Sequence, residues 1–89
     1  MEYDLLLKEL EPIADTQRIG ELLNNLKKSD DLKLIEDSLN ELQKICNTIY
    51  YKYGLSDAIL ELQVIINQTR YEYDITDRTE KTNSEGYVQ

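Results

Sequence analysis

Three carboxylates gathered between positions 36 and 41 are the first residues in this sequence that could do chemistry. Glu36, Asp37 and Glu41 would lie close together on a single helix. A catalytic pair of carboxylates needs burial that raises the pKa of one partner. All three positions fall outside the apolar pattern of their segment. We therefore interpret them as a solvated surface and not as an acid–base pair.

Other catalytic groups are scarce in the chain. It contains no histidine, which removes the commonest general base and the commonest metal ligand. Its one cysteine, Cys46, falls on an apolar helical stripe, where we expect a small buried side chain. The acids Asp74, Asp77, Glu80 and Glu85 lack the spacing and the central glycine of a calcium loop. The sequence therefore predicts no enzyme, no cofactor and no metal site.

The apolar residues between positions 32 and 73 predict a long antiparallel helical hairpin. They repeat at alternating steps of three and four, the spacing of a helix that packs along its length. From position 35 onward, each has a counterpart at the same distance on the other side of Gly54, as facing residues in a hairpin must. The first series is Leu32, Ile35, Leu39, Leu42, Cys46, Ile49 and Tyr53, and the second is Leu55, Ile59, Leu62, Ile66, Thr69 and Tyr73.

The residues at the predicted turn support the hairpin. Gly54 can end the first helix at positive φ, and Leu55 follows where the hydrophobic contact of a Schellman ending would fall. Ser56 can cap the next helix, and Asp57 adds negative charge at its positive end. We expect the first helix to follow a cap at 29–31 and to reach Tyr53. The second helix should run from 57 to about 75.

Before the hairpin, the sequence predicts shorter helices. Residues 3–10 favour a short helix, which Pro12 interrupts. A second helix should run from about Pro12 to Lys28, with Asp15 or Thr16 as alternative starts. The second half of the hairpin carries a further apolar stripe, which either packs against residues 12–28 or binds something else. This stripe is Leu60, Val64, Ile65 and Tyr71.

These elements together predict the fold class and the domain organisation. The class is all-α: a small helical bundle of residues 1–75, built on the hairpin, followed by a flexible polar tail at residues 76–89. The formal net charge of −8 argues against direct nucleic-acid binding and against an anionic membrane surface, and it favours a basic partner. With neither a signal peptide nor a long apolar run, a cytoplasmic location is expected.

The tyrosines are the best candidates for contact with a partner. Tyr53 and Tyr73 fall on the predicted seam and are expected in the core, whereas Tyr50, Tyr51 and Tyr71 fall outside it. Tyrosine is enriched at binding hot spots because it combines a large contact area with a polar tip. These three side chains are therefore predicted either to be available for binding or to be partly buried against the N-terminal helix.

We interpret the chain as a small protein-binding module, of the inhibitor, antitoxin or immunity type and phage- or plasmid-borne. Tyr50 and Tyr51 would be anchors, and nearby acids would meet Lys or Arg on the partner, in one version by imitating nucleic-acid phosphates. Those acids are Asp57, Glu61, Glu72 and Asp74. The alternative is a structural homodimer formed through Leu60, Val64 and Tyr71.

A third reading comes from a local resemblance. Residues 52–56, then 60–62 and 72–73, resemble the turn and second helix of the small aspartyl-phosphate phosphatases of sporulating bacteria, which are also short antiparallel hairpins. The resemblance implies a regulator that acts on a response regulator. That family's Ser-Gln-x-x-Asp motif is absent, since Gln63, Val64 and Asn67 stand in its places. The resemblance therefore supplies no catalytic residues.

Overall fold

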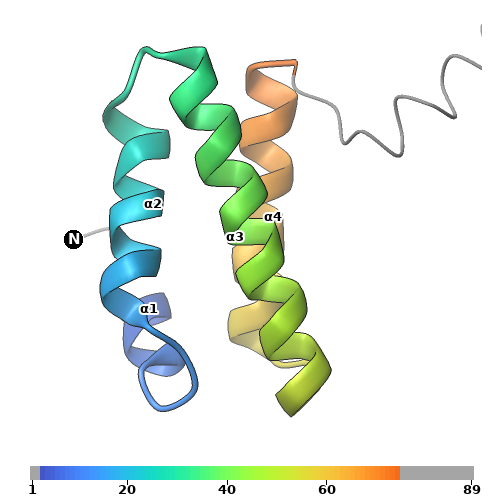
Figure 1. Cartoon of the computed structure of the whole chain (residues 1–89). Coiled ribbons are helices and arrows are strands. Elements are labelled where there is room, and N and C mark those ends of the chain that lie inside the picture. The colour runs from blue at the N-terminus through green and yellow to red at the C-terminus, as the bar shows by residue number, and fades with distance from the viewer. Residues whose placement is uncertain (1–2, 75–89) are drawn as a thin grey trace, which may run out of the picture.

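The computed structural model describes residues 3–74, which form α-helices joined by short connections. The helices are α1 (Asp4–Leu10), α2 (Thr16–Lys28), α3 (Leu32–Tyr53) and α4 (Asp57–Glu72). Helices α2, α3 and α4 run in alternating directions beside one another (Figure 1). No strand occurs among residues 3–74. The prediction of an all-α bundle is therefore confirmed, whereas the predicted tail at 76–89 lies outside the described residues.

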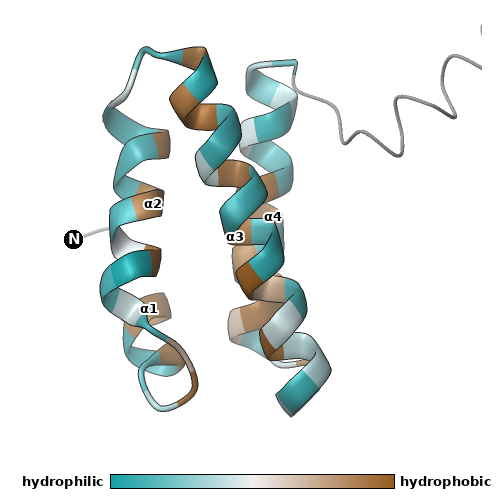
Figure 2. Ribbon diagram, viewed as in Figure 1, coloured by the Kyte–Doolittle hydropathy of each residue, from teal (hydrophilic) through white to brown (hydrophobic). Residues whose placement is uncertain are grey.

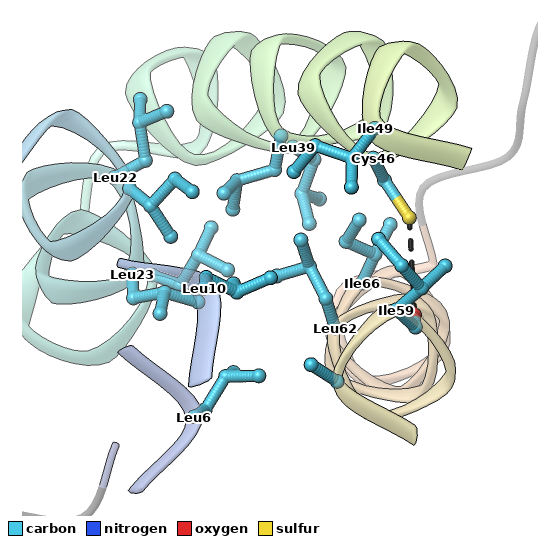
Figure 3. Close-up of a cluster of buried hydrophobic side chains, with 14 of the residues drawn as sticks. Leu6, Leu10, Leu22, Leu23, Leu39, Cys46, Ile49, Ile59, Leu62 and Ile66 are labelled. Carbon is cyan, nitrogen blue, oxygen red and sulfur yellow. Dashed lines mark hydrogen bonds between the residues drawn. The ribbon is translucent and has the colours of Figure 1, made fainter. Parts of the chain in front are cut away.

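Helices α3 and α4 form the predicted antiparallel hairpin. They pack against each other, and the central residues of both apolar series are buried. The Cys46 thiol donates to the backbone carbonyl of Ile59 at 3.8 Å (Figure 3). This contact places Cys46 within one helical turn of Leu62, as the predicted pairing requires. Thr69 is the polar member of the seam, and its hydroxyl donates to the Ile65 carbonyl at 2.9 Å within α4.

The predicted seam is wrong at its ends. Leu32, Tyr53, Leu55 and Tyr73 are all exposed, because the helix that should cover each of them has ended or not yet begun. Gly54 has the expected positive φ of 84° with ψ −174°. The chain therefore leaves α3 in an extended direction, and Leu55 does not fold back as the Schellman ending predicted.

Side-chain caps set where the helices begin. Ser56 accepts from Ile59 N–H at 3.3 Å and Asp31 from Lys33 N–H at 3.0 Å, which confirms the predicted starts of α4 and α3. Asp15 accepts from Arg18 N–H at 3.2 Å. The alternative start of α2 is therefore correct, and the start at Pro12 is wrong, because Asp15 satisfies a free N–H of the first turn.

The predicted end of α4 near residue 75 is also wrong. The helix stops at Glu72, and Asp74 adopts a positive φ of 56°. Its backbone N–H donates to the Tyr71 carbonyl at 3.3 Å. Aspartate tolerates this left-handed conformation better than most residues, so Asp74 can turn the chain out of the helix.

The largest correction concerns the neighbour of α2. This helix packs against α3, not against the outer stripe of α4, while α1 contacts both α2 and α4. The connection between α2 and α3 is only residues 29–31, which forces these two helices to be neighbours. The hydrophobic side of α2 faces α3 (Figure 2). Side chains from each described helix meet in one core, including Leu10, Leu23, Leu39 and Leu62 (Figure 3).

Polar contacts also join α2 to α3. Arg18 donates two hydrogen bonds to Glu41, from Nε to Oε2 and from Nη2 to Oε1, both 2.6 Å long. These bonds hold the pKa of the Glu41 carboxyl below its ordinary value and raise the pKa of Arg18. Deeper between the helices, Asn25 donates to the buried Ser38 hydroxyl at 3.1 Å. The interface therefore has a charged edge and a neutral interior.

Removing the Glu41 charge should reduce the dependence of the free energy of unfolding on pH in the acid range. A carboxyl whose pKa is depressed in the folded protein stabilises it above the pKa of the unfolded chain, and this contribution disappears as pH falls through the folded pKa. In urea unfolding at several pH values, Glu41→Gln should be less stable than the parent at neutral pH and equal to it in acid. Arg18→Gln should behave alike. A gap that persists in acid would contradict this assignment.

The two helix-associated glycines should respond to alanine in opposite directions. At Gly20, inside α2, an added Cβ would lie 3.6 Å from Leu7 Cδ1, an ordinary contact. Gly20→Ala should therefore raise the free energy of unfolding by about 1 kcal/mol through helix propensity. At Gly54 the positive φ makes alanine strained although space is open, so Gly54→Ala should lower it by about 1–3 kcal/mol. Urea titrations of both variants check the signs.

Candidate functional site

The outward side of α4 carries three exposed hydrophobic side chains in a line. Leu60 is 49%, Val64 50% and Tyr71 87% exposed. Steps of four and seven residues keep them on one side of the helix, opposite the buried Leu62. We call Leu60, Val64 and Tyr71 the α4 stripe. The structure places none of the described helices over these three, so the prediction that residues 12–28 cover them is wrong. Ile65, the fourth residue of the predicted stripe, is partly buried against the core.

The two borders of the α4 stripe differ in charge. Helical spacing places the exposed acids Asp57, Glu61 and Glu72 along one border. The other border faces α3 and contains Gln63 and Arg70, both partly buried. The predicted acids of α4 therefore line one side of the predicted apolar residues. Asp74 is exposed beyond the helix end and continues neither border.

A network of side-chain amides closes the hairpin beside the α4 stripe. Gln43 of α3 and Gln63 of α4 bond reciprocally, each Nε2 to the other's Oε1, at 2.8 and 2.9 Å. Each Nε2 also donates within its own helix at 3.0 Å, to Asn47 and to Asn67. Arg70 Nη1 reaches Gln43 Oε1 at 3.3 Å. We call these five residues the amide ladder. Sequence reasoning missed it, although Gln43 and Gln63 lie at nearly mirrored distances from Gly54.

Two tyrosines of α3, Tyr50 and Tyr51, lie near the turn end of the hairpin, and they point in different directions. Tyr50 is 55% and Tyr51 91% exposed, which agrees with availability for binding and not with burial against the N-terminal helix. Tyr50 follows Gln43 by seven residues, which puts it on the side of α3 that carries the amide ladder. Leu60 precedes Gln63 by three residues, so both Tyr50 and Leu60 lie toward the turn. Tyr51 points about 100° further around α3, away from α4.

The predicted site residues thus separate along the length of the hairpin. Leu60 and Tyr71 are eleven residues apart on α4, which corresponds to about 16 Å at 1.5 Å per residue. Near Tyr71 the surface has a hollow that is lined by Asn67, Gln68, Tyr71 and Glu72. The face therefore offers an elongated surface with an aromatic group at each end and Val64 between them, not one compact pocket.

The side chains that could take part in chemistry are engaged in structural contacts. Asp37 pairs with Lys33 at 3.4 Å, and Glu41 is held by Arg18. Cys46 is buried, and this burial raises the pKa of its thiol. Within residues 3–74, no three His, Cys, Asp or Glu residues are grouped so as to hold a metal ion. None of the helices in this part of the chain is long and apolar enough to cross a membrane.

Comparisons with known proteins add no further assignment. No family model matches the chain, and neither the curated proteins nor the solved structures include a significant match.

The Cys46 thiol should react slowly while the protein is folded. Burial favours the neutral thiol, whereas the thiolate is the reactive form. With Ellman's reagent at mildly alkaline pH, we expect labelling of the native protein to lag far behind labelling in urea. Labelling at the same rate in both states would contradict the buried position.

Proposed function

We propose that the outer face of the α3–α4 hairpin is a protein-binding surface, and that the chain acts as a small inhibitor, antitoxin or immunity-type factor by covering a basic surface of its partner. The observation that carries this proposal is the uncovered α4 stripe. Its side chains share one side of one helix, whereas another exposed leucine, Leu5, lies apart on α1. Grouped exposed hydrophobic residues are typical of interaction sites, whereas scattered single ones are ordinary.

The tyrosines supply anchors at the two ends of this face. Tyr71 and Tyr51 are almost fully exposed, so a partner could remove most of their surface from water. Burial is worth roughly 25 cal/mol per Å² of apolar surface, and aromatic side chains bury more than most. Tyr50 and Leu60 extend the surface at the turn end. Binding would therefore draw on several anchors spread along the hairpin.

The acids beside the stripe favour a partner with Lys or Arg. Asp57, Glu61 and Glu72 are exposed along one border, and the chain as a whole carries a net charge of −8. Opposite charges across an interface speed association and exclude wrong partners. A partner surface that binds nucleic-acid phosphates would meet the same requirement, which supports the mimic version of the proposal.

The same charges count against one form of self-association through the α4 stripe, the symmetric antiparallel pair. In a symmetric antiparallel pair, the two-fold axis places the acidic borders of both copies on the same side of the interface. Asp57 of one copy would then approach Glu72 of the other, and like charges there oppose pairing. A basic partner removes this repulsion. Self-association remains the outcome to test by sedimentation, where a dimer dissociated by Val64→Asp would replace our proposal.

Substitutions on the face should release the partner without unfolding the chain. The tagged protein would capture the partner from cells that express both, and the affinity of the purified pair would then be measured. We expect Tyr50→Ala, Tyr51→Ala and Glu61→Lys each to weaken binding about tenfold or more, as truncated anchors and reversed charges do. Added salt should weaken the parent complex. Because all three positions are exposed, circular dichroism should stay unchanged.

Matched controls lie on a different helix, α1. Leu5→Ala removes a similarly exposed leucine, and Glu9→Lys reverses an exposed acid, both on α1. Neither variant should alter the affinity. If the three face variants bind as the parent does, or if the α1 controls weaken binding equally, the proposed surface is wrong.

A further inference from the structure

The outward side of α4 has the spacing of a second helix-packing seam. Leu60, Val64, Asn67 and Tyr71 follow steps of four, three and four. The buried seam of the same helix, at Ile59, Leu62, Ile66 and Thr69, follows steps of three, four and three. Alternating steps of three and four keep side chains in a straight line along a helix, which is the arrangement that another helix covers lengthwise. We call Leu60, Val64, Asn67 and Tyr71 the outer seam.

Asn67 gives the outer seam a polar position with a free donor. Its Oδ1 accepts from Gln63 Nε2 at 3.0 Å, which orients the amide. Within residues 3–74 its Nδ2 donates no hydrogen bond, although the side chain is exposed and water can reach it. A single asparagine on such a seam fixes the register of a packed helix, because its amide needs a partner at one position.

The borders of the outer seam define the charge of the covering segment. Asp57, Glu61 and Glu72 occupy one border, while Arg70 on the other is directed toward Gln43 of the amide ladder. A covering helix would therefore carry Lys or Arg on one side of its apolar residues. Charge complementarity excludes a second copy in the symmetric antiparallel arrangement, which would bring acids against acids.

We infer that the partner contributes an amphipathic α-helix, basic along one side, which packs lengthwise on the outer seam of α4 as an additional helix of the bundle. This inference rests on the proposed function and specifies the chemistry of its partner. Helices of four to five turns match the length of α4, which has 16 residues. Helix-on-helix recognition of this kind uses apolar anchors at spacings of three and four.

Synthetic peptides test the inference directly. The first probe is an alanine-based helical peptide of about 18 residues, which spans α4, with leucines at steps of three and four and lysines along one side. The second has the same composition with its leucines at alternate positions, which destroys the helical seam. The third keeps the seam and replaces lysine by glutamate. Fluorescence anisotropy against the full chain gives the affinities.

The first peptide should bind at least tenfold more tightly than either of the others. Val64→Asp and Tyr71→Ala should each weaken it about tenfold, and Glu61→Lys should reduce the preference for the lysine peptide over the glutamate peptide. Leu5→Ala, which alters an exposed side chain on α1, should leave this binding unchanged. Equal binding of the first two peptides, no binding of the first, or binding that survives Val64→Asp would overturn the inference.

The two proposals fail in different ways. If the captured partner depends on Tyr50, Tyr51 and Glu61 but the seam peptide does not bind, the protein-binding face stands and the helical partner falls. If the seam peptide binds as described while the captured partner is indifferent to the face variants, the assignment of the whole face falls. In that case the outer seam alone remains a helix-binding surface.

Discussion

The buried seam between α3 and α4 is the contact on which the rest of the molecule depends. Leu42 and Ile66 have no solvent exposure, and Cys46 is held over the start of α4 through the Ile59 carbonyl. Once these residues face inward, the period of the helix leaves no choice for the others on α4. Leu60, Val64 and Tyr71 must then face outward, because they lie on the opposite side of the same cylinder. The exposed stripe is thus a geometric consequence of the core.

Short connections decide the remaining neighbours. Residues 29–31 hold α2 beside α3, and α1 occupies the remaining side, where it contacts α2 and α4. The main apolar side of α2 and that of α3 are thereby buried inside the bundle, although single residues such as Leu34 of α3 stay exposed. Helix α4 differs because its sequence is apolar on two sides while the fold covers only one. The proposed binding face follows from this mismatch between the composition of α4 and the helices available to cover it.

The sequence was sufficient to predict the features that depend on local spacing: the hairpin, the burial of Cys46, and the caps at Asp31 and Ser56. It was insufficient where the answer depended on which surfaces meet. The stripe of α4 was assigned to residues 12–28, because periodicity shows that a side is apolar but not what covers it. Tyr53 and Tyr73 were placed in the core, because a seam pattern does not show where its opposing helix ends. Exposure of Tyr50 and Tyr51 agrees with prediction, while their role in binding remains a proposal.

The amide ladder has a consequence for how the hairpin responds to its surroundings. Its central Gln43–Gln63 pair carries no formal charge. Neither added salt nor mild acid should therefore weaken these hydrogen bonds between α3 and α4. The ion pairs of Arg18 with Glu41 and of Lys33 with Asp37, by contrast, lie at the solvent-exposed surface. A salt concentration that weakens an electrostatic contact with a partner would therefore leave the hairpin folded. The hairpin and the proposed electrostatic contact with a basic partner would thus depend on interactions of different kinds.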